Sequence, residues 1–155
     1  IKLSCKNKKM PLERIMKEKI SADHLLYVSM KYTKTCDVML NLIVRWQSMI
    51  EIAIDALLEK AKKQRKISSI PIAPRMKVEA LKVIFKKEPD VLQTLETYEF
   101  FKRIPNLERI RECEFRKNVC LTITDRGAEI RIDMDKLKEY SELLERFIKF
   151  VRGYL

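Results

Sequence analysis

Residues 36–63 read CDVMLNLIVRWQSMIEIAIDALLEKAKK and contain neither Gly nor Pro. One apolar seam follows this stretch in steps of three or four residues: Met39, Ile43, Trp46, Ile50, Ala53, Leu57 and Ala61. Further apolar side chains cover much of the remaining circumference, and a narrow polar strip is left: Asn41, Arg45, Ser48, Asp55, Glu59 and Lys62. A helix that is apolar on most sides is covered on most sides after folding. The stretch therefore predicts the central helix of a bundle.

Shorter helical patterns flank this stretch on both sides. Upstream, Pro11 can begin a short helix that runs to Ile20, and Ser21 is a good N-cap for a second one. The sequence leaves open whether this second helix stops before the central one, so residues 21–63 are either one helix or two. Downstream, we expect helices over residues 75–87, 89–103 and 107–118, and a last one that starts at Asp133 or Asp135.

The apolar period changes to two before the last helix. VCLTIT (119–124) and EIRID (129–133) both alternate, and the residues between them include Asp125, Arg126 and Gly127, which are typical of a hairpin turn. An isolated hairpin is marginal in water, so we expect this one to pack on the helices or to pair with a second copy. The predicted fold class is all-α: an up-and-down bundle of four to five helices with one β-hairpin before the C-terminal helix.

The length of 155 residues suits one domain with a sizeable core. We divide the chain into a basic N-terminal arm with a short helix (1–20) and a single helical bundle domain (21–155), with the hairpin at about 119–133. Residues 1–10 are basic and short of apolar side chains, so we expect them to be mobile. The 35% of charged residues, mainly Lys, Arg and Glu, suits a thermophile.

The sequence favours a protein without a metal or cofactor. Its four cysteines form no CxxC pair and it has one histidine, His24, which does not suit a structural zinc site. Glycine-rich nucleotide-binding, HExxH, GxSxG and EF-hand motifs are absent. We interpret His24 as a packing or surface residue and the pair Glu51 and Asp55 as surface carboxylates. With no apolar run of membrane-spanning length and no visible signal peptide, we expect a cytoplasmic protein without membrane contact.

The net charge of +11 is concentrated in two segments. Residues 1–20 carry seven basic and two acidic side chains, and residues 60–77 carry seven basic and no acidic ones. Localised positive charge indicates an anionic partner. Basic residues at a helix C-terminus also favour the helix dipole and keep a protein soluble, which is the alternative. The candidate nucleic-acid contacts in the second segment are Lys60, Lys62, Lys63, Arg65, Lys66, Arg75 and Lys77.

A second polar cluster precedes the predicted hairpin. Arg109 and Arg116 are seven residues apart and would share one face of the predicted helix. With Phe115 nearby, such a face can hold RNA backbone and stack bases. Glutamates in the same segment, such as Glu112, can instead neutralise it in pairs one turn apart, and this surface ion-pair interpretation is the favoured one. The candidate RNA contacts here are Arg109, Arg116 and Asn118.

The order of these features resembles HEPN domains, which are small helical bundles and commonly dimeric. The resemblance spans residues 22–118 and the last helix, and it is carried by AIDALLEKAK (53–62), the proline-containing loop and short helix after it, TYEFFKRI (97–104) and FRKNV (115–119). Many HEPN proteins are metal-independent ribonucleases that use an Arg and, after four to six residues, a His. If Arg116 is that arginine, the histidine falls among residues 121–123, which read Leu-Thr-Ile. The resemblance therefore does not carry the ribonuclease activity over to this chain.

The function that this combination favours is a non-enzymatic, HEPN-like interaction module. The resemblance implies a homodimer, or pairing with a nucleotidyltransferase-type or toxin–antitoxin partner, and the apolar excess of residues 36–63 favours such contacts too. The alternative is an RNA-binding protein that uses the basic stretches. A ribonuclease with an unrecognised site, for example with His24 as the base, is the least favoured hypothesis.

Overall fold

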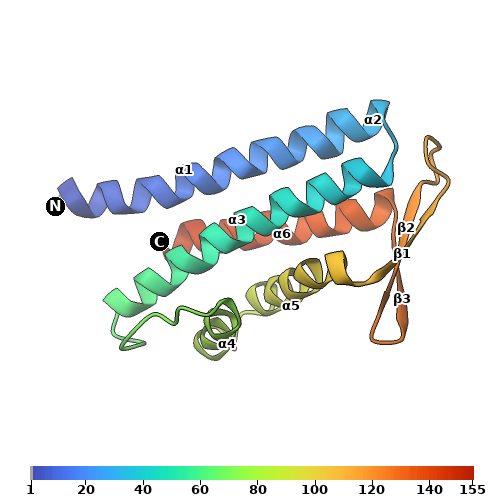
Figure 1. Ribbon diagram of the computed structural model, residues 1–155. Helices are drawn as coiled ribbons and strands as arrows, with labels where there is room; N and C mark the ends of the chain where they lie inside the picture. Colours follow the sequence, from blue (N-terminus) through green and yellow to red (C-terminus); the bar gives the residue numbers. More distant parts are fainter. Residues whose placement is uncertain (1) are drawn as a thin grey trace.

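Figure 1 shows the computed structural model, which describes residues 2–155 and the side chains from Met10 onward. In chain order its elements are α1 (Lys2–His24), the π-helical η1 (Leu25–Ser29), α2 (Met30–Tyr32), α3 (Cys36–Lys63), α4 (Pro74–Ile84), α5 (Pro89–Arg103), the 3-10 turn η2 (Ile104–Asn106), β1 (Glu108–Glu112), β2 (Cys120–Asp125), β3 (Ala128–Ile132) and α6 (Met134–Tyr154). Within residues 2–155, every helix is too short or too polar to cross a membrane.

Helix α3 is the central helix, as its sequence predicts. Every residue of the predicted seam is buried. Helix α1 lies along one side of α3, and α5 and α6 contact it from other sides (Figure 1). At the centre, the ring of Trp46 stacks on Phe101 of α5, with 6.2 Å between the ring centroids, and meets Tyr140 of α6 edge-on. Large buried rings dominate the energetics of such a core, so these contacts join α3, α5 and α6 into one unit.

Helix α1, continued by η1 and α2, replaces the predicted arm and the two short helices after it. Its backbone is helical from Lys2 and passes through both Pro11 and Ser21 without a break. Ile15 and Ala22 are fully buried in the same core as α3, and this packing outweighs the capping preference of Ser21. The structure gives residues 2–10 a helical backbone, whereas residue 1 and the side chains of residues 2–9 lie outside the described part of the chain. The mobility of this segment stays a prediction.

The helical backbone is interrupted between Tyr32 and Cys36, so residues 21–63 do not form one helix. Thr33 leaves the helical region with φ −129°, and the chain is extended at Thr35. The hydroxyl oxygen of Thr35 accepts a hydrogen bond from the backbone N–H of Val38 at 3.3 Å. A threonine that satisfies a free N–H of the first turn stabilises a helix start, so α3 begins here without any Gly or Pro.

The predicted hairpin is confirmed, and a third strand extends it. β2 pairs with β3 across a two-residue turn in which Arg126 and Gly127 have φ of 53° and 79°. Two consecutive positive φ values are what a type I′ turn requires. β1 pairs antiparallel with the other edge of β2, so the strand order is β1-β2-β3. The fold is thus mainly helical with a small antiparallel sheet, and the all-α description covers only part of it.

The helix predicted over residues 107–118 is wrong. Its first half is the strand β1 and its second half is a tight turn before β2. The spacing of Leu107, Ile110 and Cys113 suggested a helix, but Ile110 and Cys113 are exposed. The backbone of these residues is extended because it pairs with the buried strand β2. The spacing of apolar residues along the sequence does not indicate such pairing.

The sheet is held at one end of the helices by apolar and polar contacts. Leu121 and Ile123 of β2 and Ile132 of β3 are fully buried in the common core. At the hairpin turn, the guanidinium of Arg103 at the end of α5 donates two hydrogen bonds to the carboxylate of Asp125, at 3.1 and 2.8 Å. The hairpin is therefore stabilised by contacts within the chain, in agreement with the first of the two expectations, that it packs on the helices.

Candidate functional site

The basic segment 60–77 forms the end of α3, the loop after it and the start of α4. Helix α3 ends at a left-handed residue, Arg65, with φ 60°. The N–H of Arg65 donates to the carbonyl of Lys62 at 3.0 Å, and the N–H of Lys66 donates to that of Ala61 at 2.9 Å. These two bonds define a Schellman motif, in which glycine is the residue most often found at the left-handed position. Arginine stands there instead, so the helix end exposes an additional cation.

The cations of this segment differ in how far they are committed to other groups. The ammonium of Lys77 lies 2.8 Å from the carboxylate of Asp55, so its charge is compensated. Lys66 lies over the rings of Phe85 and Tyr154 and donates to the Tyr154 hydroxyl at 3.3 Å. The remaining five form no ion pair with any side chain described by the structure: Lys60, Lys62, Lys63, Arg65 and Arg75. All of these except the half-buried Lys60 are exposed.

The other basic segment of the sequence begins at the same end of the molecule. Met10 and Pro11 of α1 and Lys62 and Lys63 of α3 line one open groove of about 680 Å³, together with Glu59 and Ile70. Figure 1 shows α1 running antiparallel to α3, so the start of α1 and the end of α3 are directed toward the same end of the molecule. The first turns of α1 contain four lysines in the sequence, at positions 2, 6, 8 and 9. We call this region, residues 60–75 together with the start of α1, the basic end.

The other predicted contacts lie at the opposite end of α3. Arg109 is on β1, and Arg116 and Asn118 are in the turn between β1 and β2. The sheet lies near the start of α3, where Arg111 of β1 is 2.8 Å from Asp37 (Figure 1). A helix of 28 residues is about 40 Å long, so the structure separates the predicted residues into two groups. Arg109 and Arg116 do not share a helix face, because neither belongs to a helix.

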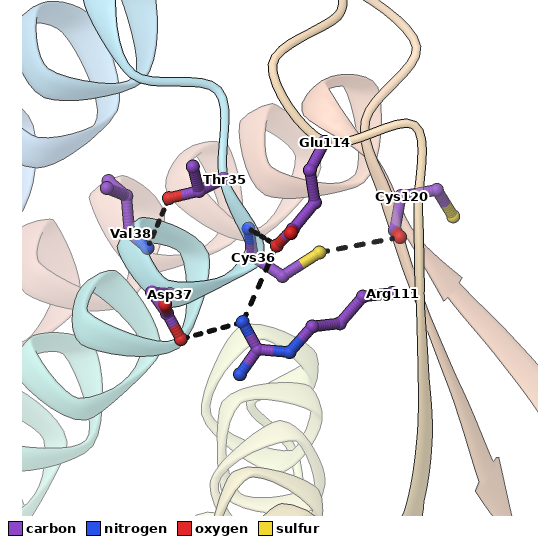
Figure 2. A network of polar contacts seen from close by, with 7 residues as sticks. All are labelled: Thr35, Cys36, Asp37, Val38, Arg111, Glu114 and Cys120. Carbon is purple, nitrogen blue, oxygen red and sulfur yellow. Dashed lines mark hydrogen bonds and ion pairs between the residues drawn. The ribbon is translucent and has the colours of Figure 1, made fainter.

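A polar network attaches this turn to the start of α3 (Figure 2). Glu114 accepts a hydrogen bond from the backbone N–H of Cys36 at 3.1 Å, and Arg111 lies between Glu114 and Asp37 at 3.5 and 2.8 Å. The thiol of Cys36 donates to the carbonyl of Cys120 at 3.5 Å. Burial, with the nearby charge of Glu114, raises the pKa of Cys36 to about 11, so this thiol stays protonated at neutral pH.

The turn itself contains two unusual backbone conformations. Cys113 and Phe115 have positive φ values of 54° and 68°, although neither is a glycine. The N–H of Phe115 donates to the carbonyl of Lys34 at 2.6 Å, and the N–H of Arg116 donates to that of Cys113 at 3.2 Å. The segment contains no Gly or Pro that would indicate a turn, so the sequence gives no signal for it.

Glu51, Asp55 and His24 lie at the surface of the described part of the chain. Glu51 accepts from the hydroxyl of Tyr98 at 3.0 Å, and both Glu51 and Asp55 are exposed, as expected for surface carboxylates. Among the described residues, no group of three or more His, Cys, Asp and Glu side chains is placed to hold a metal ion. His24 is exposed at the end of α1.

The chain matches no protein-family model, no curated protein and no solved structure. The HEPN-like resemblance therefore stays a prediction. One of the segments on which the resemblance depends is FRKNV (115–119). It forms the end of the turn between β1 and β2 and the residue directly before β2, and it is not helical.

Proposed function

We propose that the protein binds RNA through the basic end. The observation that carries this proposal is the set of exposed cations Lys62, Lys63, Arg65 and Arg75, which have no acidic partner among the described residues. Phosphate contacts by lysine and arginine supply most of the sequence-independent affinity for nucleic acids. Met10 and Pro11 of the other basic segment of the sequence line a groove with Lys62 and Lys63, so the backbones of both basic segments lie at this end of the molecule.

The helix dipole explains only part of this charge. Lys62 and Lys63 lie in the last turn of α3, where cations are favourable. Arg75 lies in the first turn of α4, which contains no acidic residue, and a cation is unfavourable at that position. Backbone N–H groups at a helix start attract anions, so Arg75 and the start of α4 together favour a bound phosphate. Arg65 occupies a left-handed position at which glycine is more stable.

The arguments for a self-associating module are weaker in the folded chain than in the sequence. Apart from the exposed Val44, the apolar surface of α3 is largely covered by the helices around it, and the hairpin pairs with β1 and packs on the core. Neither feature requires a second copy. A homodimer, or pairing with a nucleotidyltransferase-type partner, stays a prediction, and sedimentation of the chain without RNA tests it.

The test is a titration of labelled single-stranded RNA at low and moderate salt. The variant Lys62→Ala/Lys63→Ala is compared with the wild type and with a matched control, Lys102→Ala/Lys138→Ala, which removes two exposed lysines far from the basic end. Each lost phosphate contact reduces the slope of log affinity against log salt by roughly 0.7 for a single strand. We expect a reduced slope for the first variant and an unchanged slope for the control.

A flat salt profile of the wild type, or equal slopes for both variants, contradicts the proposal. The RNA is run on a gel after each titration. Shortened RNA would instead favour the ribonuclease hypothesis, which His24→Ala then tests directly.

A further inference from the structure

Two exposed aromatic residues lie on segments that a backbone hydrogen bond joins at the sheet end of the molecule. Tyr32 at the end of α2 is 78% exposed and Phe115 in the β1–β2 turn is 75% exposed. The N–H of Phe115 donates to the carbonyl of Lys34, so the turn is attached to the chain two residues after Tyr32. Isolated exposed apolar residues are common, but two large exposed rings on segments that are hydrogen-bonded to each other offer a candidate binding surface.

The backbone holds Phe115 in a strained conformation that does not bury its ring. A bulky residue with φ 68° is a conformational outlier, and such outliers persist only where surrounding contacts impose them. Here the contacts are the bond to Lys34 and the bond from Arg116 to Cys113. Glu114 is in addition anchored to the N–H of Cys36 (Figure 2). The strain therefore presents an exposed ring on a rigid support.

Most charged residues of these two segments are cations. Arg116 and Lys117 are exposed, and neither forms an ion pair with a described side chain. Lys31 lies 5.9 Å from the centre of the Tyr32 ring. The nearest acid of the turn, Glu114, is bound to Cys36 and Arg111. Exposed rings beside uncommitted cations match the chemistry of single-stranded nucleic acid, in which flat bases alternate with phosphates.

We propose that Tyr32 and Phe115 stack unpaired bases of RNA, while Arg116 and Lys117 contact the flanking phosphates. This inference rests on the proposed function, since it takes RNA as the ligand, and it adds where the bases are bound. The basic end then supplies salt-dependent affinity without preference for bases. The aromatic surface supplies the discrimination between a strand with bases and a strand without them.

The experiment compares two ligands of equal length and charge, an oligoadenylate and an abasic ribose-phosphate oligomer. Stacking on an aromatic side chain changes affinity by roughly 5- to 150-fold per base, so we expect the wild type to prefer the oligoadenylate by at least about tenfold. Phe115→Ala removes most of this preference. Phe115→Gly removes the same ring and relieves the positive φ, so it gives the same result in a chain with no additional strain.

Two further variants serve as controls. Ile110→Ala shortens another exposed apolar side chain, on the neighbouring strand β1, and is expected to keep the preference. Lys62→Ala/Lys63→Ala is expected to weaken binding of both oligomers by the same factor. Equal wild-type affinity for the two oligomers, or an unchanged preference in Phe115→Ala and Phe115→Gly, overturns the aromatic surface and leaves the basic end intact. Absence of binding to both oligomers at low salt overturns the proposed function, and this inference with it.

Discussion

The sheet end and the basic end of the molecule differ in how they are stabilised. At the sheet end, contacts join segments far apart in the sequence, such as Glu114 with Cys36 and Arg103 with Asp125. At the basic end, the turn after α3 is closed by backbone bonds within residues 61–66. The sheet end therefore uses several of its cations for folding, whereas Lys62, Lys63, Arg65 and Arg75 of the basic end form no ion pair with a described side chain. Charge that the fold does not require is charge available to a ligand.

The largest expected effect compares one aliphatic side chain at each end. Leu121→Ala deletes a fully buried side chain of β2 and is expected to lower the free energy of unfolding by about 2–5 kcal/mol. Ile72→Ala, in the loop at the basic end, shortens a side chain that is 94% exposed and is expected to change it by less than about 0.5 kcal/mol. Urea unfolding followed by circular dichroism measures both. If Leu121→Ala lowered the free energy of unfolding as little as Ile72→Ala does, the sheet would not be part of the cooperative unit.

A smaller effect is expected at the network that attaches the turn to α3. Glu114→Ala removes the acceptor for the N–H of Cys36 and one partner of Arg111, and is expected to destabilise the protein by about 1 kcal/mol. Glu114→Gln keeps an acceptor oxygen and is expected to retain part of this stability. The control is Glu108→Ala, which shortens an exposed side chain of β1. An equal loss in the Ala and Gln variants would assign the effect to the charge of Glu114 and not to its capping bond.

The smallest expected effect is a change in how the thermal stability of the protein depends on pH under acidic conditions. The guanidinium of Arg103 holds the pKa of Asp125 below its ordinary value of 3.8. A carboxylate with a lowered folded-state pKa stabilises the protein above its ordinary pKa, and this contribution is lost as the pH falls through the folded-state pKa. Asp125→Asn should therefore lower Tm at neutral pH, and the difference from the wild type should shrink below about pH 3.8.

Thermal unfolding of the two proteins between about pH 7 and pH 2.5 measures this convergence. Glu108→Gln is the control, since it neutralises an exposed carboxylate and is expected to leave Tm nearly unchanged at each pH. A difference between the wild type and Asp125→Asn that stays constant over the whole range would contradict a role for the ionised pair.

The features that local patterns encode were predictable. The seam of α3 and the Asp-Arg-Gly turn of the hairpin can be read within a few residues, since helix periodicity and turn chemistry are local properties. The strand β1 was not predictable, because its backbone depends on pairing with β2, whose nearest residue lies several positions away along the chain. The same holds for α1, where burial of Ile15 and Ala22 against distant segments outweighed the N-cap signal of Ser21.

The candidate site divides in the same way. The sequence located the basic segment 60–77, since charge is a property of composition. It did not show that Lys77 pairs with Asp55, nor that the start of α1 lies beside Lys62 and Lys63. It named Arg116 and Asn118, but on a helix face that does not exist. Tyr32 was not named as a candidate contact, because its exposure depends on which side of the helix the core covers.

The sequence by itself determined a central apolar helix, a late hairpin and two basic segments, because periodicity, turn residues and charge are fixed by near neighbours along the chain. Only the tertiary structure decided that the basic segments meet at one end and that a strained aromatic turn occupies the other. Those outcomes depend on antiparallel packing of α1 on α3 and on a bond between Phe115 and Lys34, and both join segments that are far apart in the sequence.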